Sequence, residues 1–166
     1  MNQNIFQMES NQSFDKPKFG WVVDGATEGN PGMSEYRGID LQTNKVVFHQ
    51  KIGVATNNIT EFLAVVHAIA EQKKRDIKLP IYTDSMTALS WVKHKKCNSN
   101  LKPGRYTNLA IEMQERAETF LKSIKFDLSE SDVIKHDGIE IMKWFTKSWG
   151  EIPADFGNKI NRYNSK

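Results

Sequence analysis

The pattern of hydrophobic and polar residues predicts that the first third of the chain is made of strands. Residues 18–24 form an apolar run that stops at Asp24, and residues 35–41 and 46–52 are two further strand-like runs. A glycine- and proline-rich stretch over residues 25–32 predicts a turn after the first strand. Because only short polar segments separate the three runs, we expect an antiparallel meander.

Helical spacing begins in the second third. Residues 58–74 carry apolar side chains on nearly all sides of a helix, which is typical of a buried helix. The remaining predicted elements are, in order, a strand over 81–83, helices over 85–95 and 108–121, a strand over 139–145, and a helix from Pro153 to about residue 161. Since helices connect the later strands, we predict an α/β fold: a five-stranded mixed sheet, with parallel strands after the antiparallel ones, flanked by helices.

Composition places these elements in one soluble domain. The chain has 166 residues, 39% of them hydrophobic and 26% charged, with no window apolar enough for a membrane span. Residues 1–17 are polar and without periodicity, so we expect a disordered tail before a domain over 18–166. The N-terminus lacks the features of a secretory signal. A single cysteine, Cys97, excludes an intrachain disulfide framework, and we expect a cytoplasmic monomer without an obligate protein partner.

Charge alone does not identify a partner. The 23 basic and 20 acidic residues give a net charge of only +3. Two basic runs, over 73–75 and 93–96, are typical of solvated helix ends. They indicate nucleic-acid binding only beside independent signs of phosphate contact.

Four acidic residues stand at the ends of predicted elements. Asp24 and Asp84 end strands, whereas Glu61 and Asp155 lie in the first turns of helices. If the first and fourth strands are neighbours, their carboxylates meet at the crevice where open α/β sheets place ligands. Clustered carboxylates repel one another unless a proton or cation neutralises them, and hard oxygen ligands favour Mg²⁺ or Mn²⁺ over zinc.

Each acid also has a structural interpretation. Asp24 could cap the following turn, and Asp84 could cap the following helix. Asn58 and Glu61 have the spacing of a capping box. Asp155 would favour the dipole of a helix beginning at Pro153. The joint placement of four acids, more than any single one, favours the metal site.

Four motifs carry a family resemblance. They are DGATEGNPG at 24–32, TNNITEFLAVVHAI at 56–69, YTDSMTALSWV at 82–92 and WGEIPADFGNK at 149–159. In this order and spacing they resemble type 1 ribonuclease H, most closely the bacterial subgroup whose last motif is W-G-E-I-x-A-D. Residues 129–138 fall outside any pattern of that family.

The resemblance implies an endonuclease that cuts the RNA strand of RNA/DNA hybrids and leaves 5′-phosphate and 3′-hydroxyl ends. Asp24, Glu61, Asp84 and Asp155 match the family's metal-binding carboxylates, which would hold two Mg²⁺ ions, or Mn²⁺ in their place, with Asp24 shared by both. Glu151 matches a glutamate that assists metal exchange and product departure.

The resemblance also implies a nucleic-acid surface. Asn57 would contact the RNA side and Asn58 the DNA side. Thr56, Asn58 and Ser99 would bind a DNA phosphate, with Asn100 where the subgroup commonly has a hydroxyl. The full set of implied contacts is Thr27, Gly29, Asn30, Thr56, Asn57, Asn58, Ser85, Trp91, Lys93, Lys96, Ser99, Asn100 and Thr146. Helix capping and tight turns are the structural alternatives for the polar members of this set.

Two rival functions remain open at the level of sequence. One is a non-catalytic nucleic-acid-binding module, although such a module gains nothing from keeping four like charges together. The other is a different nuclease or integrase of the same superfold, because fold does not settle function.

Overall fold

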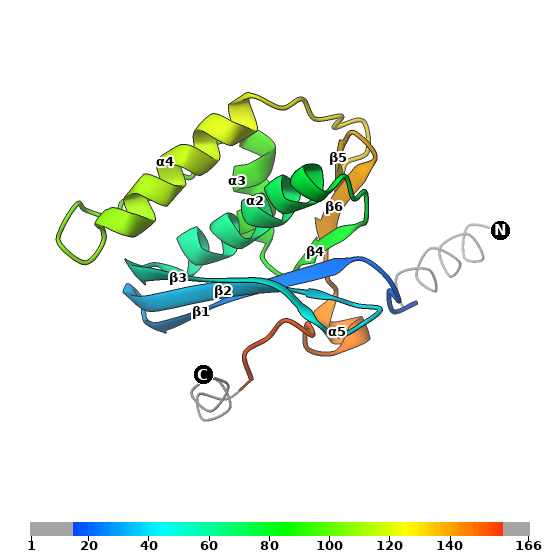
Figure 1. The fold of residues 1–166 in the computed structure, drawn as a ribbon, viewed down its shortest axis with the longest axis horizontal. Coiled ribbons are helices and arrows are strands. Elements are labelled where there is room, and N and C mark those ends of the chain that lie inside the picture. Colours follow the sequence, from blue (N-terminus) through cyan, green and yellow to red (C-terminus); the bar gives the residue numbers. More distant parts are fainter. Residues whose placement is uncertain (1–14, 158–166) are drawn as a thin grey trace.

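The computed structural model describes residues 15–157, which form a mixed sheet with helices on both faces (Figure 1). The strands are β1 (Trp21–Gly29), β2 (Gly32–Asp40), β3 (Val46–Ala55), β4 (Ile81–Thr83), β5 (Val133–His136) and β6 (Ile139–Lys143). The helices are α2 (Asn57–Arg75), α3 (Met86–His94), α4 (Asn108–Lys122) and α5 (Thr146–Trp149). Within these residues the sheet has six strands in the order β3-β2-β1-β4-β6-β5, so the predicted mixed α/β sheet is confirmed and the number five is wrong.

The predicted neighbours β1 and β4 lie side by side in the centre of the sheet. They are parallel, with Trp21 opposite Ile81 and Val23 opposite Thr83, and β4 is in turn parallel to β6. The antiparallel meander of β1, β2 and β3 is also confirmed. Because Val23 is the last residue of β1 that pairs with β4, opposite Thr83, the next residues, Asp24 and Asp84, lie close together.

The strand missing from the prediction is β5, which pairs antiparallel with β6 through a two-residue turn. Asp137 and Gly138 form that turn with φ of 48° and 85°. Positive φ at both positions matches the right-handed twist of hairpin strands, and Asp-Gly is a preferred pair there. The Asp-Gly pair between two alternating apolar segments is thus the sequence signal for this hairpin.

Strand β1 is longer than predicted. Instead of ending at Asp24 it continues to Gly29, because β2 pairs with it along its whole length, from Trp21 opposite Asp40 to Gly29 opposite Gly32. The predicted turn over 25–32 is therefore confined to Asn30 and Pro31. Glycine is required at position 32, where a Cβ atom would lie 1.7 Å from the carbonyl oxygen of Glu28.

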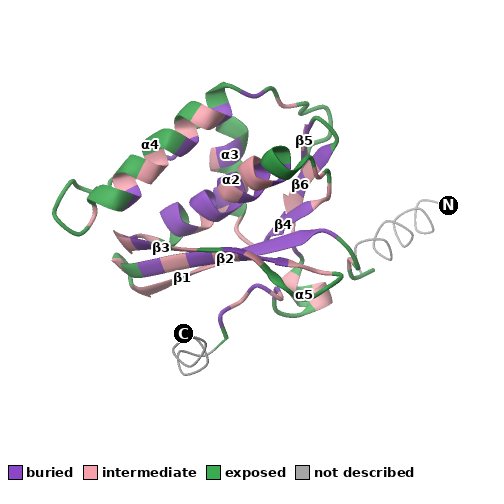
Figure 2. Ribbon diagram, in the orientation of Figure 1, coloured by how far each residue is buried: buried purple, intermediate pink, exposed green. Residues whose placement is uncertain are grey.

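Two apolar layers hold the sheet, one on each face. Helix α2 lies between the sheet and the helices α3 and α4, which explains why it is buried along most of its length (Figure 2). On the opposite face a smaller cluster joins the sheet to the segment that follows α5; it comprises Val22, Ile39, Tyr82, Trp144, Ile152 and Ala154. None of the helices in the described part of the chain has the length and hydropathy needed to cross a membrane.

The C-terminal prediction is wrong where it can be tested. Residues 153–157 are not helical, and the four-residue helix α5 precedes them instead. The backbone carbonyls of Ala154 and Asp155 accept hydrogen bonds from the Arg37 side chain, and Gly157 has a φ of +67°. Both features oppose a helix here. The rest of that predicted helix, and residues 1–14 of the predicted tail, lie outside the described residues.

Candidate metal centre and nucleic-acid surface

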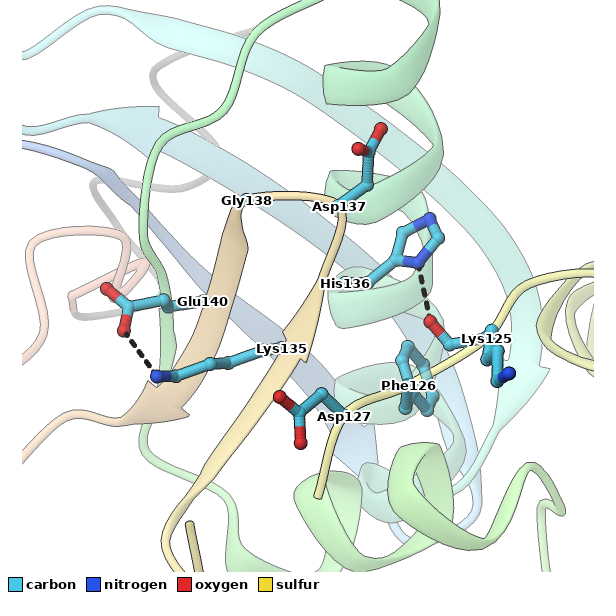
Figure 3. A pocket seen from close by; sticks show the side chains of 8 residues that line it. All are labelled: Lys125, Phe126, Asp127, Lys135, His136, Asp137, Gly138 and Glu140. Carbon is cyan, nitrogen blue, oxygen red and sulfur yellow. Dashed lines mark hydrogen bonds and ion pairs between the residues drawn. The ribbon is translucent and has the colours of Figure 1, made fainter. Parts of the chain in front are cut away.

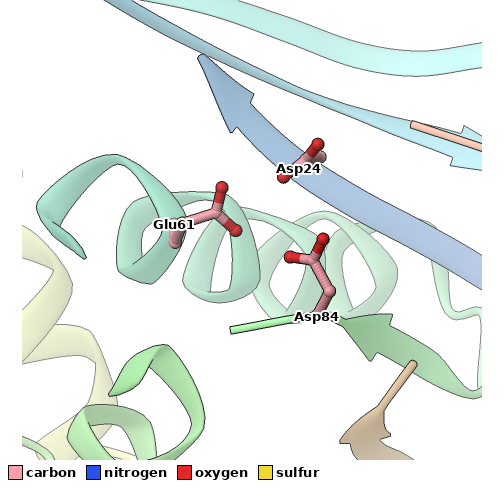
Figure 4. A group of neighbouring side chains, drawn as sticks. All are labelled: Asp24, Glu61 and Asp84. Carbon is pink, nitrogen blue, oxygen red and sulfur yellow. The ribbon is translucent and has the colours of Figure 1, made fainter. Parts of the chain in front are cut away.

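Three carboxylates from distant parts of the chain point into one space (Figure 4). Asp24 lies within β1, Glu61 on the N-terminal part of α2, and Asp84 directly after β4. One carboxylate oxygen from each lies within 4.8 Å of the other two. The parallel pairing of β1 with β4 brings Asp24 and Asp84 together, and the packing of α2 on β1 adds Glu61.

Glu61 is held by the backbone of β1. The N–H of Gly25 donates to its Oε1 at 2.8 Å. The proposed capping box with Asn58 is not formed, since Thr56 is the N-cap of α2 and its hydroxyl accepts from the N–H of Ile59 at 3.2 Å. The other oxygen of Glu61, Oε2, is buried, and no N–H or hydroxyl group of the described residues donates to it. Helix capping therefore does not explain the orientation of the Glu61 side chain.

Burial and neighbouring negative charges raise the pKa of all three carboxyls. Burial raises the pKa of Asp24 to about 7; the hydrogen bond with Glu61 opposes the rise and the charge of Asp84 adds to it. Burial, followed by the charge of Asp24, raises the pKa of Glu61 well above its usual value. Burial also raises the pKa of Asp84, while the charge of Lys143 lowers it. Ionising all three carboxyls at once is thus unfavourable unless a cation offsets their negative charge.

The donor set fits Mg²⁺ or Mn²⁺. All three residues offer carboxylate oxygens, which these hard cations prefer. The unpartnered Oε2 of Glu61 is the oxygen whose burial a cation would offset most directly. A structural, capping role accounts for neither this atom nor the raised pKa values.

The fourth and fifth predicted acids lie near this group without joining it in the structure. Asp155 is half-buried in a turn, where its N–H donates to the carbonyl of Ile152 at 2.8 Å. Glu151 is exposed. The charges of Asp155 and Glu151 both raise the pKa of Asp84, so both lie within electrostatic reach of the three carboxylates.

Arg37 is a residue of this region that the sequence reading missed. It lies opposite Asp24 in the β1–β2 ladder, and its guanidinium donates to the carbonyls of Ala154 at 2.9 Å and Asp155 at 2.8 Å. Its guanidinium carbon lies 4.6 Å from the centroid of the Phe156 ring. Nothing in the local pattern of β2 marks this arginine, because its partners lie more than a hundred residues away.

Several of the predicted nucleic-acid contacts meet at the N-terminus of α2. The side chain of Asn30 accepts from the N–H of Asn57 at 3.0 Å, which ties the β1–β2 turn to the helix. The hydroxyl of Thr27 lies 3.4 Å from that of Thr60 and 3.0 Å from that of Ser34. The members of the set that share this region are Thr27, Gly29, Asn30, Thr56, Asn57 and Asn58.

The other predicted contacts lie on α3, in the loop after it and on α5. Ser85 is the N-cap of α3, its hydroxyl accepting from Ala88 at 3.0 Å. Trp91 is half-buried and packs edge-on against Phe62 of α2. Lys93, Lys96 and Asn100 are exposed, Ser99 and Thr146 are half-buried, and the Ser99 hydroxyl accepts from the N–H of Leu101 at 3.1 Å.

A cavity of about 660 Å³ beside the β5–β6 turn is a weaker candidate (Figure 3). Its central imidazole, His136, is already engaged at both nitrogens. Nδ1 donates to the carbonyl of Lys125 at 2.7 Å, and Nε2 accepts from the ammonium of Lys73 at 2.9 Å. Lys135 pairs with Glu130 at 2.7 Å and Lys78 with Asp137 at 3.4 Å. These contacts tie the hairpin to α2 and to its neighbouring loops.

Comparison with known proteins identifies a family for most of the chain. The sequence model of the RNase H family matches residues 17–143, which include Asp24, Glu61 and Asp84 but end before Glu151 and Asp155. A ribonuclease H of Neorickettsia sennetsu is 34% identical over 88 residues, which cover 47% of this chain and 58% of that protein. The chain thus matches little more than half the length of this relative.

Solved structures resemble the chain more distantly. The RNase H1 of Halobacterium salinarum NRC-1 is 18% identical, with a TM-score of 0.48, over 77% of this chain and 86% of the other. LC11-RNase H1, solved in complex with an RNA/DNA hybrid, is 16% identical, with a TM-score of 0.40, over 62% and 75% of the two chains.

Proposed function

The chain belongs to the RNase H family, and on that premise we propose that it is an endonuclease that hydrolyses the RNA strand of RNA/DNA hybrids. The products would carry 5′-phosphate and 3′-hydroxyl ends. The observation that carries the proposal is the group of Asp24, Glu61 and Asp84, whose carboxylate oxygens converge within 4.8 Å. A module that only bound nucleic acid would gain nothing from burying three mutually repelling acids.

Asp24, Glu61 and Asp84, together with Asp155, would hold two Mg²⁺ ions. When bound, the ions supply an activated water and stabilise the departing 3′ oxygen. The protein's part is to hold its acids in place. The N–H of Gly25 fixes one oxygen of Glu61, leaving the other for a cation, and Arg37 fixes the backbone of Asp155. No nucleophilic side chain is required.

Recognition of the hybrid would use the surface around the N-terminus of α2. The 2′-hydroxyl is the group that distinguishes RNA from DNA at one position. Small polar groups at the β1–β2 turn and at Asn57 are suited to contact it from the minor groove. Asn30 and Asn57 are joined by a hydrogen bond, so the turn and the helix would meet the substrate as one unit. Lys93 and Lys96 would add phosphate contacts that weaken as salt increases.

The experiment that tests this function compares labelled RNA/DNA, RNA/RNA and DNA/DNA duplexes with Mg²⁺ present. We expect cleavage of the RNA strand in the hybrid alone. The Asp84→Asn variant should lose cleavage but still bind the hybrid, and EDTA should abolish wild-type activity. Cleavage of duplex DNA at a similar rate, or full activity in Asp84→Asn, would refute the proposal.

A further inference from the structure

A groove of about 440 Å³ lies on the face of α3 that is turned toward β5 and β6. Met86, Leu89 and Lys93 line it from α3 at three- and four-residue spacing, which places them on one side of the helix. Trp91, which belongs to the predicted hybrid surface, packs instead against Phe62 of α2. Lys93 belongs to both surfaces, so the groove adjoins the predicted hybrid surface on α3, and its size is in the range of ligand-binding clefts.

Large apolar side chains that line the groove are exposed to solvent. Met86 is 59% exposed and Phe145 is 42% exposed, and both line the groove. The rings of Phe145 and Trp149 stand 5.0 Å apart at 78°, so two aromatic surfaces with different orientations meet here. Clustered exposed apolar groups of this kind mark a binding surface more often than isolated ones do.

The charges around the groove favour an anionic partner. Lys93 and Lys143 line it, together with His94, against a single acid, Asp132. The charge of Lys143 also lowers the pKa of Asp84, so the groove begins within electrostatic reach of the carboxylates. Aromatic surfaces combined with basic side chains are the combination by which proteins bind unpaired nucleotides: the bases stack and the phosphates meet the cations.

We propose that this groove binds unpaired ribonucleotides that continue the RNA strand beyond the hybrid. The inference rests on the proposed function, because a strand cut at Asp84 must pass that residue. Met86, two residues after Asp84, and Lys143, whose charge acts on Asp84, both line the groove, so the groove begins beside the carboxylates. Trp91, one of the implied hybrid contacts, packs against Phe62 and does not line the groove.

The test is a binding measurement in the Asp84→Asn background, where cleavage does not interfere. Fluorescence anisotropy compares a short blunt hybrid with hybrids that carry a single-stranded extension at either end of the RNA or of the DNA. We expect an RNA extension at one end to tighten binding by about fivefold or more. Met86→Glu and Phe145→Ala should each remove this gain while leaving affinity for the blunt hybrid unchanged.

Leu109→Glu is the matched control, since Leu109 is 47% exposed but lies on α4, away from the groove. It should retain the gain. No gain from any RNA extension would overturn the inference, as would a gain that survives both groove variants or an equal gain from DNA extensions. The first two results would indicate that the groove binds a protein partner and not RNA. Failure of the proposed function would give a different result: the wild type would not cleave the blunt hybrid, or the protein would not bind it.

Discussion

Arg37 holds the backbone of Asp155 in place beside Asp24. Its Nη2 donates to the carbonyl of Asp155 at 2.8 Å across 118 residues of sequence, and its Nε donates to the carbonyl of Ala154. Arg37 is also the residue opposite Asp24 in the β1–β2 ladder. One side chain therefore connects the strand of the central carboxylate to the segment that carries the fourth acid.

We predict that Arg37→Gln lowers the rate of hybrid cleavage roughly tenfold or more, since a small displacement of a catalytic group has effects of that size. The Mg²⁺ concentration needed for half-maximal activity should rise, because Asp155 would be less well placed as a ligand. Arg37→Lys should rescue little, because an ammonium does not reproduce the two-pronged contact of a guanidinium. Steady-state kinetics over a range of Mg²⁺ concentrations measures both effects.

Arg105→Gln is the control for that experiment, as Arg105 is exposed and stacks only on its neighbour Tyr106. It should leave the Mg²⁺ dependence unchanged. If Arg37→Gln lowered thermal stability but left the Mg²⁺ dependence and the rate per folded molecule as in the wild type, the arginine would be structural and not a positioning residue.

The raised pKa of Asp24 predicts how stability depends on pH without metal. Its pKa rises from 3.8 to about 7 on folding, so the folded chain binds more protons than the unfolded chain between these values. In EDTA, the free energy of unfolding should therefore fall by a few kcal/mol as the pH rises from about 4 to about 7. Urea denaturation across this range measures the change.

Two comparisons isolate the source of this pH dependence. Asp24→Asn should be more stable than the wild type at pH 8 in EDTA and should show a flatter profile, whereas Asp132→Asn, at an exposed position, should follow the wild type. Mg²⁺ should restore stability at pH 8, because the cation replaces the bound protons. Wild-type stability that increased between pH 4 and 7 in EDTA would contradict the assignment.

The β5–β6 hairpin offers a test of the fold. Gly138 has a φ of +85°, so Gly138→Ala should cost roughly 1–2 kcal/mol of folding free energy. Gly104→Ala is the matched substitution, because a Cβ at position 104 would meet only the hydroxyl of Thr107 at 3.6 Å. Equal denaturation midpoints for the two variants would mean that the turn is not as strained as the structure indicates.

Glu151 is exposed and close enough to raise the pKa of Asp84 without being one of the three converging acids. We predict that Glu151→Gln lowers turnover more than it lowers affinity for the hybrid, which is the behaviour of a group that assists exchange of metal and product. Binding and multiple-turnover rates, measured on the same hybrid, separate the two effects. A loss confined to affinity would make Glu151 a binding residue.

The sequence was sufficient where structure follows from local pattern. Helical spacing identified α2, and the crossover through it implied parallel strands in a mixed sheet. The expectation that β1 and β4 are neighbours, which brings Asp24 and Asp84 together, is confirmed by their parallel pairing. The end of an apolar run did not locate the end of β1, because strand pairing depends on backbone hydrogen bonds that side chains do not reveal. The Asp137-Gly138 pair is a local signal from which the β5–β6 hairpin could have been predicted.

Contacts between distant segments were beyond such a reading. The segment carrying Asp155 was predicted to be helical from Pro153 and its first-turn acid, both sound local signals. The Arg37 contacts with its carbonyls outweigh those signals, and no local pattern in β2 indicates that they form. The alternative capping role of Glu61 is wrong for a local reason, since the helix begins one residue earlier than predicted and Thr56 is its cap.

We propose that Asp24, Glu61 and Asp84 form a divalent metal centre. Anomalous diffraction from crystals of the wild-type protein grown with Mn²⁺ tests this site, because the ion itself is located in the density. We expect an anomalous peak among these three carboxylates, within bonding distance of Oε2 of Glu61 or of Asp24, and its loss in Asp24→Asn. At saturating Mn²⁺, no peak there, or peaks only elsewhere on the surface, would show that these acids do not form a metal site.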